Sequence, residues 1–153
     1  MRRRLGSGGA AATSLGVLLI GVALIFTGSG VQAASGEIVV IANPDVTLDD
    51  IAPKFLERIY LGKRTRWDDD RTIVPVMLKA GPTHEEFVET YLERSVHRFV
   101  TYWRQLVFTG KGVPPKSFGD EQALVAYVAG TAGAIGYVSE GNVAAGVKIL
   151  RVR

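Results

Sequence analysis

Apolar residues follow a strand-like pattern in four places from residue 38 onward. The run from Ile38 to Ala42 is continuous and rich in β-branched side chains, which is typical of a strand buried on both faces. Similar runs predict strands at 73–78, 134–138 and 147–152. Since proline cannot donate to a ladder, Pro75 places the strand at 73–78 at a sheet edge or strand start.

Apolar residues three or four positions apart predict helices between these strands. The first begins with Asp50 as its cap and ends at Gly62, with Pro53 in its first turn. A T-x-x-E capping box, Thr83 with Glu86, opens the second.

Two further helices follow. Ser95 caps the third, and the fourth begins at Ser117 or Asp120 and ends at Gly130. The third helix is expected to place its apolar residues on one face: Val96, Phe99, Val100, Trp103 and Val107. Strands interleaved with helices predict an α/β domain with a small mixed or parallel sheet covered by helices.

The N-terminal segment has a different pattern. Arg2, Arg3 and Arg4 precede a stretch without charge, and the apolar run from Leu15 to Phe26 is shorter than the roughly 20 residues that span a bilayer. With small residues before a cut after Ala33, this layout predicts a cleaved signal peptide at 1–33 and one domain at 34–153, periplasmic or secreted. An uncleaved single-span anchor is the alternative.

Composition and charge narrow the picture further. The 153 residues include 18 Lys and Arg, 15 Asp and Glu and no cysteine, which excludes disulfide scaffolds, thiolate zinc sites and cysteine nucleophiles. The net charge of +3 equals the contribution of the three N-terminal arginines, so the domain at 34–153 is formally neutral. Basic residues alternate with acidic ones, so no stripe for nucleic acid is expected.

Catalytic and metal-binding patterns are missing. The Gly-Lys pairs at 62–63 and 110–111 lack the rest of a phosphate loop, and the run Asp68–Asp70 lacks the spacing of a calcium loop. His84 and His97 have no zinc-ligand spacing, and Ser139 lacks a nucleophile elbow. We therefore expect no enzyme activity, no metal and no cofactor.

One candidate anion site remains. Lys79 ends the strand predicted at 73–78 and precedes the turn Gly81-Pro82 and the helix that Thr83 opens. Free amides and the positive end of the helix dipole converge at such a helix start, and a lysine adds a full charge. The residues expected to contact an anion are Lys79, Gly81, Thr83 and His84.

Two segments resemble the phosphate-binding proteins of ABC importers, which belong to the type II periplasmic-binding-protein superfamily. They are LERIYLGKRTRW, from Leu56 to Trp67, and TAGAIGYVS, from Thr131 to Ser139. The strand IVPVMLK and the turn into a helix fit the same family. The resemblance covers nearly all of the domain but only one of the family's two lobes.

The resemblance implies an exported, non-catalytic protein that binds or senses inorganic phosphate or a similar small anion. Compared with the family's S-G-T stretch, Gly81 and Pro82 replace the Ser and Gly, and only Thr83 matches. A single lobe cannot enclose its ligand, so a second copy in a homodimer or another protein would supply the facing wall. An inner-membrane permease or a sensor protein is the expected partner. The alternative is an envelope interaction module that keeps the fold and has lost phosphate binding.

Overall fold

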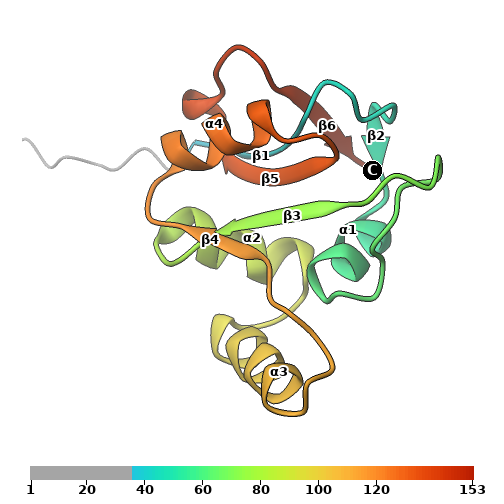
Figure 1. Ribbon diagram of the computed structural model, residues 1–153. Coiled ribbons are helices and arrows are strands. Elements are labelled where there is room, and N and C mark those ends of the chain that lie inside the picture. Colours follow the sequence, from blue (N-terminus) through green and yellow to red (C-terminus); the bar gives the residue numbers. More distant parts are fainter. Residues whose placement is uncertain (1–35) are drawn as a thin grey trace, which may run out of the picture. The chain divides into compact units, whose positions relative to one another are not determined.

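The computed structural model describes residues 36–153, and the signal segment predicted at 1–33 lies outside them. In the described part, six strands form one sheet in the order β2-β6-β1-β5-β3-β4 (Figure 1). The strands are β1 (Ile38–Ala42), β2 (Asp50–Ile51), β3 (Val74–Leu78), β4 (Lys116–Phe118), β5 (Ala134–Ser139) and β6 (Lys148–Val152).

The sheet is mixed, which is one of the two arrangements that the sequence predicted. β1 pairs antiparallel with both β5 and β6, whereas β3 runs parallel to β5 on one side and to β4 on the other. The carboxyl ends of β3, β4 and β5 therefore point to the same edge of the sheet. Helices or turns that follow these strands must begin at that edge.

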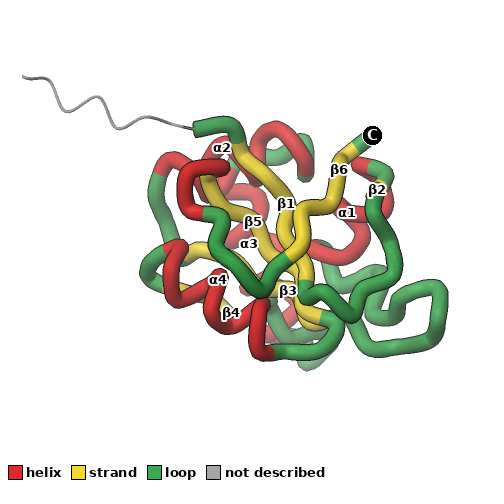
Figure 2. Tube along the Cα trace, turned by 90° about the horizontal axis from the view of Figure 1, so that it is seen from above, coloured by secondary structure: helices red, strands yellow, loops and turns green. Residues whose placement is uncertain are grey.

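Helices cover both faces of the sheet (Figure 2). They are α1 (Pro53–Tyr60), α2 (Pro82–Tyr91), α3 (Val96–Phe108), α4 (Glu121–Gly130) and the single 3-10 turn η1 (Glu140–Asn142). Successive residues of a strand point to opposite faces. On β5, Gly136 lies under α4, where an added Cβ would come within 2.7 Å of Leu124, and Tyr137 stacks on Phe87 of α2 at 3.6 Å.

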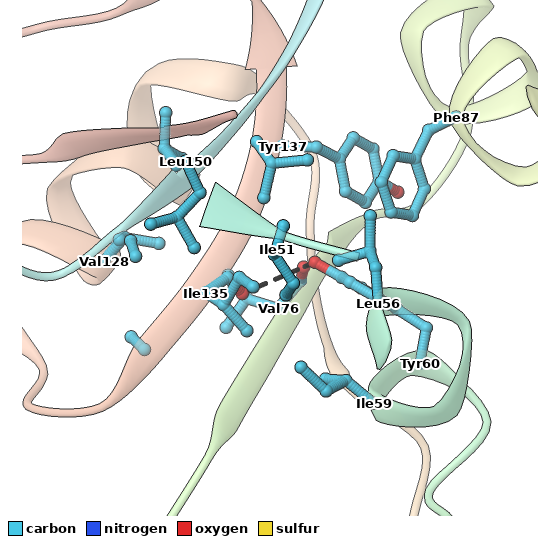
Figure 3. Close-up of a cluster of buried hydrophobic side chains, with 14 of the residues drawn as sticks. Ile51, Leu56, Ile59, Tyr60, Val76, Phe87, Val128, Ile135, Tyr137 and Leu150 are labelled. Carbon is cyan, nitrogen blue, oxygen red and sulfur yellow. Dashed lines mark hydrogen bonds between the residues drawn. The ribbon is translucent and has the colours of Figure 1, made fainter. Parts of the chain in front are cut away.

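The hydrophobic core lies between the sheet and its helices. Figure 3 shows Tyr60 of α1, Phe87 of α2 and Tyr137 of β5 meeting in it, with Val76 and Ile135 beside them. The Tyr60 hydroxyl donates to the carbonyl of Val76 at 3.0 Å, so its polar end is satisfied although the side chain is fully buried. The buried apolar side chains come from residues 38–150, which gives the described domain a core of its own.

Several predicted helix boundaries are confirmed. Ser95 caps α3 by accepting from the amide of Arg98 at 3.4 Å, and Asp120 caps α4 by accepting from the amide of Ala123 at 2.7 Å. Ser117 lies instead in β4, a strand that the sequence did not predict. Gly62 follows the C-cap of α1 with a positive φ of 69°, as expected of a helix end.

Two predicted helix starts are wrong. The cap of α1 is Ala52, because Asp50 belongs to β2, which pairs with β6. The capping box at Thr83 and Glu86 does not form, since the N-cap of α2 is Gly81 and no side chain caps it. The hydroxyl of Thr83 is bonded instead to Glu121, a residue distant in the sequence.

Two other expectations hold only in part. Of the two places predicted for Pro75, a sheet edge or a strand start, the structure has the start: Pro75 is the second residue of β3, an interior strand, and β4 pairs only with Val76 to Leu78. The apolar face expected of α3 is split, because Phe99 and Trp103 are buried whereas Val100 and Val107 are exposed. The domain therefore covers only part of the apolar face of α3.

Candidate functional site

The edge where β3, β4 and β5 end brings three segments together. Thr83 is in the first turn of α2, Glu121 is the first residue of α4, and Ser139 ends β5. In α/β sheets the carboxyl ends of parallel strands are the usual place for ligands, because helix starts and loops converge there. We refer to the cluster of Thr83, Glu121, Ser139 and Asn142 as the Glu121 cluster.

One carboxylate collects all the donors of the Glu121 cluster. Glu121 accepts from the Thr83 hydroxyl at 2.6 Å and from the Ser139 hydroxyl at 2.7 Å. It also accepts from the Ser139 amide at 2.9 Å and from the Asn142 side-chain amide at 2.8 Å. Hydrogen bonds to a charged group are the stronger kind, so these side chains form a site that stabilises negative charge.

The pKa of Glu121 reflects this arrangement. Partial burial of Glu121 raises the pKa of its carboxyl, but the hydrogen bonds from Thr83, Ser139 and Asn142 outweigh burial and hold the pKa below its usual value. The group is therefore ionised at neutral pH. The negative charge that this edge stabilises is thus the protein's own Glu121 carboxylate, and not a bound ligand.

The sequence-predicted contacts differ in their access to this edge. Lys79 is exposed, and it forms no ion pair within the described part of the chain. Gly81 adopts φ 107° at the N-cap, and an added Cβ there would meet nothing within 4 Å, so no other part of the described domain crowds this position. The hydroxyl of Thr83 is engaged by Glu121.

His84 lies behind the edge and not on it. Its side chain is only 3% exposed, and its Nδ1 lies 2.6 Å from the hydroxyl of Tyr137. That hydroxyl already accepts from the amide of Leu78 at 3.2 Å, so its own hydrogen is available to a neutral Nδ1. His84 thus ties the first turn of α2 to β5, beneath the surface that a solute would reach.

Burial lowers the pKa of His84 below its ordinary value of 6.5, while the charge of Glu85 opposes this shift. The unfolded chain therefore takes up a proton that the folded protein does not, and stability is lost as pH falls below 6.5. We expect the free energy of unfolding to fall between pH 6.5 and about 5, by no more than about 1.4 kcal/mol per pH unit for one proton.

Urea unfolding at several pH values measures this effect. His84→Gln keeps a polar side chain but cannot titrate, so its free energy of unfolding should change less with pH in that range. His97→Gln is the matched control, because His97 is exposed on α3, and this variant should keep the wild-type slope. If the free energy of unfolding of His84→Gln depends on pH as steeply as that of the wild type, His84 is not the group responsible.

Sequence reasoning missed the acceptor at the centre of the site. Glu121 follows the cap Asp120 and was indistinguishable from an ordinary acidic residue in the first turn of a helix. Ser139 was considered only as a nucleophile. Their positions in the sequence could have indicated the site. Glu121 begins a helix and Ser139 ends a strand, and both lie at the edge where the parallel strands end.

The two segments that carry the family resemblance meet each other in the core. The indole Nε1 of Trp67 donates to the carbonyl of Gly133 at 3.1 Å, and the Tyr60 hydroxyl lies 3.4 Å from the carbonyl of Ile135. Gly133 has φ 71°, and an added Cβ would lie 2.2 Å from the carbonyl oxygen of Thr72. These motif residues stabilise the fold and do not line the edge.

Comparison with solved structures gives the fold a counterpart. An ABC-type phosphate transport receptor from Vibrio cholerae matches with a TM-score of 0.57 and 18% identity over 74% of this chain. A putative phosphate ABC transporter substrate-binding protein with bound phosphate from Clostridium perfringens matches with a TM-score of 0.61 and 22% identity over 75% of this chain. The domain has the fold of an ABC phosphate-binding protein lobe.

A third structure, PstS from Borrelia burgdorferi, matches with a TM-score of 0.58 and 15% identity over 76% of this chain. The chain spans less than half of each of these proteins, 44% of the first two and 47% of the third. No family model and no curated protein matches it. The mixed α/β fold and its likeness to one lobe are thus as the sequence predicted.

The similar structures are binding proteins and not enzymes. Within residues 36–153, no group of three or more His, Cys, Asp or Glu side chains is placed to hold a metal ion. None of the helices in this range has the length and apolar character needed to cross a membrane.

Proposed function

We propose that the chain is an exported, non-catalytic binding component that recognises phosphate or a similar small anion at the edge where β3, β4 and β5 end. Lys79 supplies the positive charge, and Gly81 and Thr83 present the uncapped start of α2. His84 acts from behind by fixing that turn to Tyr137. The signal peptide at 1–33 and the single domain at 34–153 belong to the same proposal.

The convergence of four donors on Glu121 is the observation that carries this proposal. The start of α2, the end of β5 and the turn η1 hold these donors in place, so they are preorganised for an anion. The similar protein from Clostridium perfringens holds phosphate. An anion that reaches this edge must share it with the Glu121 carboxylate, which predicts weak binding.

Isothermal titration with phosphate tests the proposal on the chain from Ala34 to Arg153. We expect a dissociation constant in the millimolar range, and Lys79→Ala should weaken binding about fivefold because it removes the one full positive charge at the α2 start. Lys54→Ala is the matched control, since its side chain is 78% exposed on α1. Absence of heat at millimolar phosphate, or an equal loss of affinity in the two variants, would contradict phosphate binding at this site.

A second candidate function is an interaction module that has lost phosphate binding. The observation that favours it is the same carboxylate, because Glu121 satisfies the donors and repels a second anion. The free edge would then dock a protein, such as a permease, a sensor or a second copy of the chain. If neither the wild type nor Glu121→Gln binds phosphate, this candidate replaces the first.

A further inference from the structure

The helix α3 is the outermost element on its side of the domain (Figure 1). It packs on the end of α1 through one face, where the Trp103 indole donates to the Tyr60 carbonyl at 3.1 Å. The Tyr102 hydroxyl donates to the Leu61 carbonyl at 2.7 Å in the same contact. The opposite face of α3 has no helix or strand of the domain to cover it.

Exposed apolar side chains lie along α3 and in the loop that follows it. Val100 and Val107 lie beside the buried face, within one turn of Trp103, whereas Phe108 lies farther round toward the outer side, and Val113 follows in the loop to β4. Phe108 is 90% exposed and Val113 is 86% exposed, against 46% for Ile149 on β6. Exposed apolar side chains that gather in one segment indicate a contact surface, whereas scattered single residues do not. We call these four residues the α3 apolar stripe.

Charge is segregated around the same helix. From Arg94 to Gly119 the sequence contains no Asp or Glu, so the interleaving of basic and acidic residues expected along the domain does not hold in this segment, although the domain as a whole is neutral. The basic residues of this segment are Arg94, Arg98, Arg104, Lys111 and Lys116, and none of them takes part in the ion pairs of the described residues. The rest of the domain carries the compensating negative charge.

A hollow lies beside the α3 apolar stripe. It has a volume of about 350 Å³ and is lined by Arg94, His97, Arg98, Thr101, Tyr102 and Gln105. Two guanidinium groups on one hollow suit a phosphodiester group, which arginine binds through two parallel hydrogen bonds. The stripe and the hollow therefore place apolar and anion-binding chemistry side by side on one helix.

We propose that this face of α3 docks onto a membrane surface that contains anionic phospholipid. Phe108 and Val113 enter the boundary between headgroups and acyl chains, and Arg98, Arg104 and Lys111 contact headgroup phosphates. Amphipathic helices with a basic flank and exposed aromatic and aliphatic residues bind membranes in this way. The apolar side chains protrude from a helix and its following loop and do not line a groove, which suits a deformable lipid surface better than a rigid protein partner.

Vesicle sedimentation with the chain from Ala34 to Arg153 tests the proposal. This chain retains the whole described core and omits the apolar N-terminal run, which would itself bind lipid. We expect binding to vesicles of phosphatidylglycerol and phosphatidylethanolamine, and at least tenfold weaker binding to phosphatidylcholine or in molar salt. The double variant Phe108→Ser, Val113→Ser should bind at least tenfold more weakly than wild type.

Ile149→Ser is the matched control, because Ile149 is exposed but lies on β6, and it should bind as wild type does. Circular dichroism shows whether each variant is folded, and the substituted side chains are exposed, so all should be. Failure of the wild type to bind anionic vesicles, or equal binding by the double variant, would overturn the proposal. Binding to polyglutamate without binding to vesicles would also overturn it and would indicate an acidic protein partner.

Discussion

Replacing Glu121 with glutamine is expected to raise the affinity of the domain for phosphate by about tenfold. Glutamine keeps one oxygen, which can still accept from Ser139 and Asn142, and its NH2 group takes the place of the oxygen that accepts from Thr83. The substitution removes the charge that competes with the ligand. A phosphate dianion about 5 Å from a carboxylate is repelled by roughly 1.7 kcal/mol even in water, which corresponds to about a tenfold change in affinity. Isothermal titration of both proteins at one ionic strength measures the difference.

Glu89→Gln is the matched control for this prediction. It removes the same charge from an exposed position farther along α2, away from the Glu121 cluster, so phosphate affinity should change by less than about twofold. If Glu121→Gln binds phosphate no better than wild type, the carboxylate does not compete for the anion. The proposal that the donors around it serve an external anion would then be wrong.

Gly133→Ala is expected to destabilise the domain by about 3 kcal/mol or more. The residue has φ 71°, a conformation that a side chain disfavours, and an added Cβ would lie 2.2 Å from the Thr72 carbonyl oxygen. Movement of the backbone to relieve that contact would also weaken the bonds from Trp67 Nε1 and to Asp45. Urea unfolding of the variant and the wild type measures the loss.

The matched control for Gly133 is Gly119→Ala, because an added Cβ there would meet no atom within 4 Å. Its free energy of unfolding should change by less than about 1 kcal/mol. Similar losses in the two variants would mean that the turn before β5 relaxes easily. The contact between the two resemblance motifs would then contribute little to the fold.

The elements that the sequence predicted correctly are those whose signals are local. The β-branched run at β1 and the caps Ser95 and Asp120 depend on residues within one strand or one helical turn. Short elements escaped prediction, because β2 has two residues and β4 has three, too few for a period to appear. The cap of α2 was predicted wrongly, since the hydroxyl that favours a capping box is bonded to Glu121.

The candidate site was predicted in part. The position of Lys79 and Gly81 at the start of α2 follows from the order of strand, turn and helix, and both reach the surface as expected. The burial of His84 was not predictable, because the side chain is covered by Tyr137 and Phe99, which come from β5 and α3. The Glu121 cluster was missed because three separate segments form it.

By itself the sequence determined the α/β order and most helix boundaries, because periodicity and capping are properties of neighbouring residues. Only the tertiary structure decided which donors bind the Glu121 carboxylate and which apolar residues of α3 are exposed to solvent. Both depend on contacts between segments distant in the sequence, and residue spacing carries no information about those distances. The fold could therefore be predicted from local pattern, whereas the charge at the edge where β3, β4 and β5 end could be found only from the packed structure.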